Sequence, residues 1–323
     1  MTFNKLLGFF IIALFSAQLS ANTLLDRIVA VVNDEIILLS ELSEQTEQAL
    51  MELRQRQIAA PDQAALRERV LDNMIMQTLQ QERAKQRGLR VSDDEVNAQL
   101  LEMAEANSLT LVQLREVLNR EMPDGFARIR DQISEQILIQ KLREVEVISQ
   151  IHVTEEEVNH FIQRRQLQQT NIEFNMAHIL ITRPDSPTSE QRTEIENKVK
   201  DIHQRLQRGE DFAQLAVRYS EGSQALNGGD LGWLDFDQIP SFFAEIIETM
   251  QPGEISKIIE SPSGYHILKL IDTRSSGQQN GVTLEQEAIQ TIRMRKANET
   301  FDLWMRRLRD EAFVEIRLDQ EAP

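Results

Sequence analysis

The stretch Gly228-Gly229-Asp230-Leu231-Gly232-Trp233 decides the fold of the middle of this 323-residue chain. Its glycines are typical of a tight turn that leads into a strand. Two apolar, strand-like segments with one histidine each flank it, Ala177-His178-Ile179-Leu180 before it and Gly264-Tyr265-His266-Ile267-Leu268 after it. Further blocks lie between them: Tyr219-Ser220-Glu221, Phe243 and Pro252-Gly253-Glu254-Ile255-Ser256. The blocks together indicate one mixed sheet-and-turn domain.

In order and spacing these blocks resemble the parvulin-type peptidyl-prolyl isomerase domain. The resemblance implies an inserted α+β domain of the FKBP-like βαααββ type. It also implies site residues: His178, Ser261 and His266 match the hydrogen-bonded group beneath the parvulin active site. The apolar proline pocket would be formed by Leu231, Ile239 and Phe243. Taken alone, the pocket residues also suit an ordinary core, and the histidines suit a structural role as well as proton transfer.

The chain departs from the parvulin pattern at Gly222, the fourth candidate catalytic position. Parvulins carry Asp or Cys there, beside the substrate amide, and glycine supplies neither a charge nor a polarisable group. Two interpretations follow. Either the carboxylate of Glu221 turns toward the substrate, or the site has lost catalysis and kept peptide binding. We favour weak or absent activity, because neighbouring residues on an extended segment face opposite sides.

Isomerising an X-Pro bond requires a fitted pocket and no cofactor. The rotation crosses about 18–20 kcal/mol, because resonance holds the amide planar. A catalyst must bind the ring and stabilise the charge that changes on the twisted amide. We therefore expect no cofactor. We expect no metal either, because the histidines show neither cysteine partners nor HExxH-like spacing; they are His152, His160, His178, His203 and His266.

Glycine and proline divide the chain into regions. Residues 22–171 contain only Gly88, Gly125, Pro61 and Pro123, whereas residues 172–275 contain seven glycines and five prolines. The first region is therefore predicted to be helical and the second to be a mixed domain. Pairs of Ser or Thr with Glu or Gln three residues later predict helix starts at Ser92, Thr110, Thr154, Thr188 and Thr283. Apolar stripes such as Leu66, Val70 and Met74, or Phe126, Ile129, Ile133 and Ile137, predict mutual burial.

The two ends of the chain are predicted to meet. Residues 28–32 and 314–318 are strand-like, and a lone strand would leave its backbone groups unpaired. A helix from Thr283 to about Glu311, with Ile292, Phe301, Trp304 and Leu308 on one side, would pack onto the N-terminal helices. The expected domains are a signal peptide (1–21), an N-terminal helical chaperone domain (22–171), a parvulin-type domain (172–275) and a returning C-terminal helix and strand (276–323).

Both ends also resemble the SurA family of periplasmic chaperones for outer-membrane proteins. The segments that carry the resemblance are Leu25 to Asn33, Val91 to Val96, Leu109 to Leu111, Arg293 to Lys296 and Trp304-Met305. The chain differs from many members in having one parvulin module where they have two. The resemblance implies unfolded outer-membrane β-barrel proteins as partners, through aromatic-rich segments and X-Pro peptides, and contact with the outer-membrane assembly machinery as a further possibility.

Composition and the first residues favour an exported protein. Lys5 and the apolar run from Leu6 to Phe15 match a signal peptide, with cleavage after Ala21 or, alternatively, after Ala17. There is no cysteine for a lipid anchor, so we expect periplasmic localisation without a stable membrane anchor. The formal net charge of -17 disfavours nucleic acid. No GxxxxGK[ST] loop is present, so no ATP use is expected.

Apolar, adaptable surface is what a chaperone needs in order to hold unfolded chains. Methionines are frequent in the helical region, at positions 51, 74, 76, 103 and 122. Their flexible thioethers suit a promiscuous groove, and filling gaps in the core is the alternative use. The rival function is that of a secreted prolyl isomerase whose helices merely present substrate. A third is an interaction module held near the outer-membrane assembly machinery.

Overall fold

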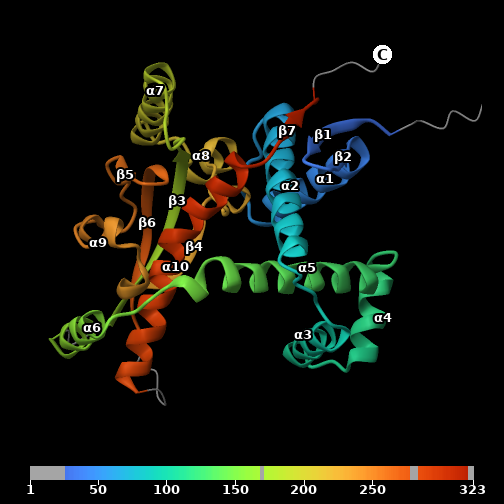
Figure 1. The fold of residues 1–323 in the computed structure, drawn as a ribbon, viewed down its shortest axis with the longest axis horizontal. Coiled ribbons are helices and arrows are strands. Elements are labelled where there is room, and N and C mark those ends of the chain that lie inside the picture. Colours follow the sequence, from blue (N-terminus) through green and yellow to red (C-terminus); the bar gives the residue numbers. More distant parts are fainter. Residues whose placement is uncertain (1–25, 168–170, 277–282, 319–323) are drawn as a thin grey trace, which may run out of the picture.

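The computed structural model describes residues 26–167, 171–276 and 283–318 (Figure 1). The elements of the helical body are β1 (Ile28–Val32), β2 (Glu35–Leu38), α1 (Leu39–Gln55), α2 (Gln63–Gln86), α3 (Asp93–Ala106), α4 (Leu111–Glu121), α5 (Gly125–Glu146), η1 (Ile148–Gln150) and α6 (Glu155–Leu167). The elements of the parvulin module are β3 (Asn171–Thr182), α7 (Ser189–Gln207), α8 (Phe212–Tyr219), η2 (Ala225–Asn227), β4 (Asp230–Asp235), η3 (Phe236–Gln238), α9 (Ser241–Ile247), β5 (Ile259–Ser261) and β6 (Gly264–Ser276). The chain then forms α10 (Leu284–Asp310) and β7 (Val314–Ile316). The predicted export signal, its cleavage sites included, lies outside the described residues.

The predicted pairing of the two chain ends is confirmed. β1 pairs antiparallel with β7, with Val31 opposite Glu315, and β7 brings the C-terminal segment beside the first strand (Figure 1). An additional strand that was not predicted, β2, forms a hairpin with β1 and gives the sheet order β2-β1-β7. The turn between them places Asn33 at φ +49°, a left-handed conformation that Asn tolerates better than most residues.

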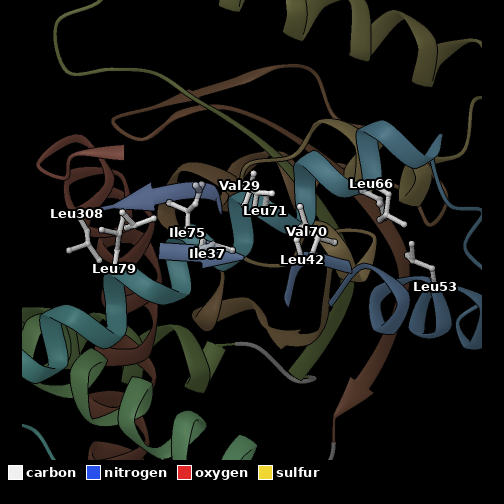
Figure 2. Close-up of a cluster of buried hydrophobic side chains, with 13 residues drawn as sticks. Val29, Ile37, Leu42, Leu53, Leu66, Val70, Leu71, Ile75, Leu79 and Leu308 are labelled. Atoms are coloured by element: carbon white, nitrogen blue, oxygen red, sulfur yellow. The ribbon is translucent and has the colours of Figure 1, made fainter. Parts of the chain in front are cut away.

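A hydrophobic core seals this small sheet onto the helices. Figure 2 shows Val29 and Ile37 from the sheet, Leu42 and Leu53 from α1, and Leu308 from α10, around a row of side chains from α2: Leu66, Val70, Leu71, Ile75 and Leu79. Every member of the cluster is at least nine-tenths buried. Each fully buried Leu or Ile contributes about 1.5–3 kcal/mol. The stripe predicted from Leu66 and Val70 is thus the surface that joins both chain ends.

The helix boundaries follow the capping residues that the sequence predicted. Ser92, Thr110 and Thr188 form reciprocal capping boxes with Glu95, Gln113 and Gln191. Thr154 and Glu157 satisfy each other in the same way, and Thr283 accepts a hydrogen bond from the backbone N–H of Gln286. Gly88, at φ +70°, follows α2 in the left-handed conformation that commonly ends a helix. The other predicted stripe, Phe126, Ile129, Ile133 and Ile137, packs against α3 and α4.

The parvulin module is built around an antiparallel sheet with strand order β4-β3-β6-β5. α7 and α8 cover one face, through Ile179 and Ile181 of β3 and Ile202 and Phe212 of the helices. On the other face, Met176 of β3 and Leu268 of β6 pack against Phe243 and Ile247 of α9. The expected α+β class is confirmed. Along the chain, β4 comes between α8 and α9, the second and third helices of the module.

α10 belongs to both parts of the molecule, and Figure 1 shows it crossing the sheet of the module on its way to β7. Its first turns bury Ala288 and Ile292 against Phe161 of α6, and its last turns bury Leu308 in the core of the chain ends. Between these ends it contacts η3 and α2. Among the described residues, no helix is both long and apolar enough to cross a membrane.

Candidate functional site

The structure brings the two predicted histidines into direct contact on one face of the module's sheet. His178 of β3 and His266 of β6 lie on neighbouring antiparallel strands, where Leu180 is opposite His266. Nε2 of His178 is 2.7 Å from Nδ1 of His266, and the two ring planes are 18° apart. Nε2 of His266 is in turn 2.6 Å from Oγ of Ser261. The sequence therefore placed three members of one hydrogen-bonded chain correctly.

Both imidazoles are neutral over the physiological pH range. Burial lowers the pKa of His178 to about 4. Burial, followed by the charge of His178, lowers the pKa of His266 to about 2. Two neutral rings that share one hydrogen bond require one facing nitrogen to carry the proton and the other to accept it. The tautomer of one histidine therefore fixes that of the other.

The residues predicted to form the proline pocket lie in a cluster that reaches this pair. Leu231, Ile239 and Phe243 belong to one apolar cluster, in which Ile239 and Phe243 are buried and Leu231 is partly buried. The Phe243 ring centroid is 5.2 Å from that of His266 and 5.6 Å from that of His178. An apolar surface bordered by neutral imidazoles suits a pyrrolidine ring.

The glycines of the opening motif set the position of His178. The carbonyl of Gly229 accepts a hydrogen bond of 2.8 Å from the backbone N–H of His178. A Cβ on Gly229 would lie 2.4 Å from the carbonyl oxygen of His178, and its φ is +78°. No other residue could bring β4 this close to β3 in that conformation.

Gly222 lies next to Leu180, which is two residues from His178 and therefore on the same side of β3. Ser220 holds this loop to the strand, because its buried Oγ accepts hydrogen bonds from the N–H groups of Leu180 and Gly222. A Cβ at Gly222 would be 3.5 Å from both Leu180 Cβ and Ser220 Oγ, which is an ordinary contact. The backbone therefore leaves room for a Cβ atom at this position.

Glu221 is engaged elsewhere. Its carboxylate accepts hydrogen bonds from the N–H of Thr182 at 2.9 Å, from the Thr182 hydroxyl and from the Lys198 ammonium at 2.8 Å. Burial alone would raise the pKa of Glu221, but the Lys198 charge and these hydrogen bonds outweigh it and leave the pKa lowered. A fixed ion pair of this kind favours the interpretation that Glu221 does not replace the missing carboxylate.

Three residues that the sequence analysis did not select also belong to the site. Phe242 has its ring centroid 5.4 Å from that of His266 and 4.4 Å from that of Phe243. Ser263 has its Oγ 3.3 Å from Nε2 of His266 and 2.8 Å from Oγ of Ser261. Ser220 anchors the Gly222 loop. Ser220 belongs to the motif block Tyr219-Ser220-Glu221, to which no role was assigned, whereas only closeness in sequence to Phe243 and Ser261 pointed to Phe242 and Ser263.

A cavity of about 460 Å³ lies next to Gly222 and is walled by both parts of the molecule. The module contributes Leu180, the 220–223 loop and Leu226, while the helical body contributes side chains of α2, α5 and α10. Its apolar lining includes Met76, Ile139, Phe301 and Met305. Asp72 and Asp302 also line it. Burial raises the pKa of Asp72, and raises that of Asp302 to about 6 against the opposing charge of Arg143.

The methionines singled out in the sequence do not form one surface. Met74 and Met76 pack against the core of the chain ends, and Met103 packs against α4 and α5. Met51 and Met122 are exposed. Of these five, Met76 lines the cavity. Within the described residues, no group of three His, Asp or Glu side chains gathers closely enough to hold a metal ion.

Comparison with known proteins agrees with this architecture. The SurA N-terminal domain family matches residues 25–143, and the PPIC-type PPIASE domain family matches residues 178–272. A protein of Hahella chejuensis named Chaperone SurA is 35% identical over 298 residues, which are 92% of this chain and 68% of that protein. The chain belongs to the SurA family.

Other SurA relatives are longer than this chain. Chaperone SurA of Hydrogenovibrio crunogenus is 45% identical over 271 residues, 84% of this chain and 60% of that protein. The chain thus spans about 60% of the length of such relatives. A solved PpiC-type peptidyl-prolyl cis-trans isomerase domain is 31% identical, with a TM-score of 0.30, and covers 33% of this chain and 96% of its own.

Proposed function

We propose that this SurA-family chain is a periplasmic chaperone that assists folding and assembly of outer-membrane β-barrel proteins. Support for the chaperone activity comes from relatives named Chaperone SurA and from the cavity that module and body share. The signal-like first residues support export to the periplasm. Unfolded barrel strands, with their aromatic girdles, are the expected clients by family resemblance.

The shared cavity is the observation that carries this proposal. Its flexible Met and Phe side chains suit varied apolar segments. Asp72 and Asp302 add acceptors for backbone N–H groups, because among the described residues neither carboxylate accepts a hydrogen bond. Asp72 interacts with the charges of Arg69, at 3.6 Å, and Arg309, and Asp302 with that of Arg143. Sequence-tolerant binding needs this mixture of apolar lining and unsatisfied polar groups.

The test is suppression of aggregation of a chemically unfolded β-barrel protein, followed by light scattering at near-stoichiometric ratios. Met305→Glu places a charge in the cavity and is expected to weaken suppression, because the carboxylate would have to be desolvated when an apolar segment binds. Met51→Glu is the matched control, since Met51 is 58% exposed on α1. Equal effects of the two substitutions would count against the cavity, and unimpaired aggregation with the unmodified chain would count against chaperone activity itself.

The parvulin module is proposed to isomerise X-Pro bonds weakly. The histidine pair and the proline pocket favour catalysis, and Gly222 disfavours it. Gly222→Asp should raise the rate of a proline-limited refolding reaction at substoichiometric protein, where a pure holdase would have no effect. Gly222→Asn is the isosteric control without charge. If the unmodified chain already accelerates this phase strongly, the rival function of a secreted isomerase is the better one.

A further inference from the structure

Arg306 of α10 extends out of the helical body and ends inside the parvulin module. Its Nη1 donates hydrogen bonds to the carbonyl oxygens of Arg183, at 2.6 Å, and Pro262, at 2.8 Å. Its Nη2 donates to the carboxylate of Asp185. Arg306 is only 8% exposed. A buried guanidinium with this many partners is strongly fixed in place.

Pro262 is the middle residue of the turn that holds His266. The hydroxyls of Ser261 and Ser263 lie 2.6 and 3.3 Å from Nε2 of His266. The N–H of Ser263 donates to Oγ of Ser261, which locks the two serines together. Gly264 closes the turn, where a Cβ would lie 2.2 Å from the carbonyl oxygen of Ile181. The turn is therefore fixed by β3 on one side and by Arg306 on the other.

The position of this turn decides how the histidine pair shares its proton. If the Ser261 hydroxyl donates to Nε2 of His266, then Nδ1 of His266 carries the proton toward His178; if it accepts, the proton lies on His178 Nε2. Hydrogen-bond strength falls steeply with distance and angle. A turn free to shift would therefore let both arrangements be populated.

We propose that Arg306 is a positioning residue of the isomerase site: by fixing the Ser261-Pro262-Ser263 turn, the chaperone helix α10 selects one tautomer of the His266–His178 pair. The inference rests on the proposed role of this pair in isomerisation. The tautomers of the two histidines can be measured even if the site does not turn over substrate. It also gives α10 a second task beyond joining the chain ends, since the helix sets the protonation pattern of a site in another module.

The alternative is that Arg306 only docks the module onto the body. Two substitutions separate the roles. Arg306→Met removes all three contacts, whereas Asp185→Asn removes the ion pair and leaves the hydrogen bonds to the Arg183 and Pro262 carbonyls. Asp185 is exposed, so the new amide stays in water, and the buried Arg306 keeps its two backbone carbonyl partners. Arg307→Gln, at the exposed neighbouring position, is the control for loss of charge on α10.

The experiment records the ¹⁵N chemical shifts of the imidazole nitrogens in the full chain, since protonated and unprotonated ring nitrogens resonate far apart. We expect resolved single tautomers of His178 and His266 in the unmodified chain, in Asp185→Asn and in Arg307→Gln. Arg306→Met should give averaged shifts for both rings. If that variant fails to fold, Arg306→Lys replaces it, because a single ammonium cannot form the hydrogen bonds that Nη1 and Nη2 of the planar guanidinium donate. Unchanged shifts in whichever variant folds would overturn the proposal.

A kinetic arm distinguishes failure of this inference from failure of the proposed isomerase. If the unmodified chain or Gly222→Asp isomerises a proline peptide, Arg306→Met in the same background should lower kcat about tenfold with little change in KM, a loss of the size that removal of an orienting partner causes at metal-bound histidines. A lowered rate with unchanged nitrogen shifts would make Arg306 a docking residue and refute positioning. Absence of turnover in every variant would refute the isomerase, while the shifts would still decide the role of Arg306.

Discussion

The two joints that hold this molecule together differ in chemistry. The terminal joint, formed by β1, β7, α2 and Leu308 of α10, is a dry apolar core. The module joint fastens the parvulin module to α6 and α10 through charged groups, which are Arg164, Arg165, Asp235, Asp237 and Glu287 at one end and Arg306 with Asp185 at the other. A third contact of the module is apolar, because Val217 of α8 is fully buried in the same core as the α2 side chains. In the module joint, Arg165 lies 2.9 Å from Glu287, and Arg164 lies 2.7 Å from the buried Asp237.

Because of this difference, the terminal joint should stay closed in the native state, whereas the stability of the module joint should vary with solution conditions. Apolar burial is insensitive to salt and needs no partner geometry, whereas ion pairs respond to salt, pH and loss of one member. Burial raises the pKa of Asp237, against the charges of Arg164 and Arg165, so the carboxylate is costly to bury without its guanidinium partners. The chain ends should therefore separate only on unfolding of the body, whereas the attachment of the module to α6 and α10 should depend on its charges.

The largest effect is expected from Leu71→Ala in the terminal joint. Leu71 is 1% exposed, and the truncation should reduce the free energy of unfolding by about 2–5 kcal/mol through lost burial and the cavity left behind. Urea unfolding followed by circular dichroism measures it, with Leu101→Ala, at a side chain 46% exposed on α3, as the control. If Leu71→Ala reduced the free energy of unfolding by less than Leu101→Ala does, this core would not be what holds the chain ends together.

Arg165→Met should have the next largest effect, at the module joint. It takes a guanidinium away from the buried Asp237 and from Glu287, so a loss of about 2–4 kcal/mol is expected, near the lower range for a broken buried pair because Arg164 stays beside Asp237. The loss should shrink as salt rises, since the unmodified pairs are screened. Glu210→Gln, in the surface pair with Arg205, is the control and should cost under about 1 kcal/mol. A salt-independent loss would place Arg165 in packing rather than in charge pairing.

Asp302→Asn should stabilise the chain, by about 1–2 kcal/mol at pH 7. Burial raises the pKa of Asp302 from 3.8 in the unfolded chain to about 6. The native state therefore binds the extra proton between these values, and the charged form costs stability above pH 6. The gain on removing the charge should disappear as the pH falls from 6 to below 3.8. Thermal melts of both proteins from pH 4 to pH 8 measure it; a gain that does not depend on pH would have another cause.

The sequence could predict what local patterns encode. Capping residues such as Ser92 and Thr188 satisfy neighbouring backbone groups, so their signal needs no tertiary structure. The two terminal strands were paired correctly because each required a partner. β2 was missed because four residues, with Ile36 half-exposed beside buried Ile37, form too short a pattern.

The module joint could not be predicted in this way. Arg165, Asp237 and Glu287 are far apart in sequence, and charged residues on helices are ordinarily solvated. Nothing in the local pattern at Arg306 distinguishes it from the exposed Arg307. Within the site, the histidine pair was found through the family resemblance, whereas Phe242 and Ser263 emerged only from their contacts with His266.

The smallest effect tests whether the two joints transmit stability between the parts. Thr188→Ala removes the cap of α7 inside the module, and Ser92→Ala removes the matching cap of α3 in the body; each should cost about 1 kcal/mol. If the charged contacts to α6 and α10 dominate the module joint over the packing of Val217, the Thr188 change should lower the free energy of unfolding of the module alone, and the Ser92 change that of the body alone. Hydrogen exchange of β3 and α2 amides reads the two parts separately. If both amide sets lose protection equally in either variant, the joint couples the module to the body as tightly as the apolar core couples the chain ends.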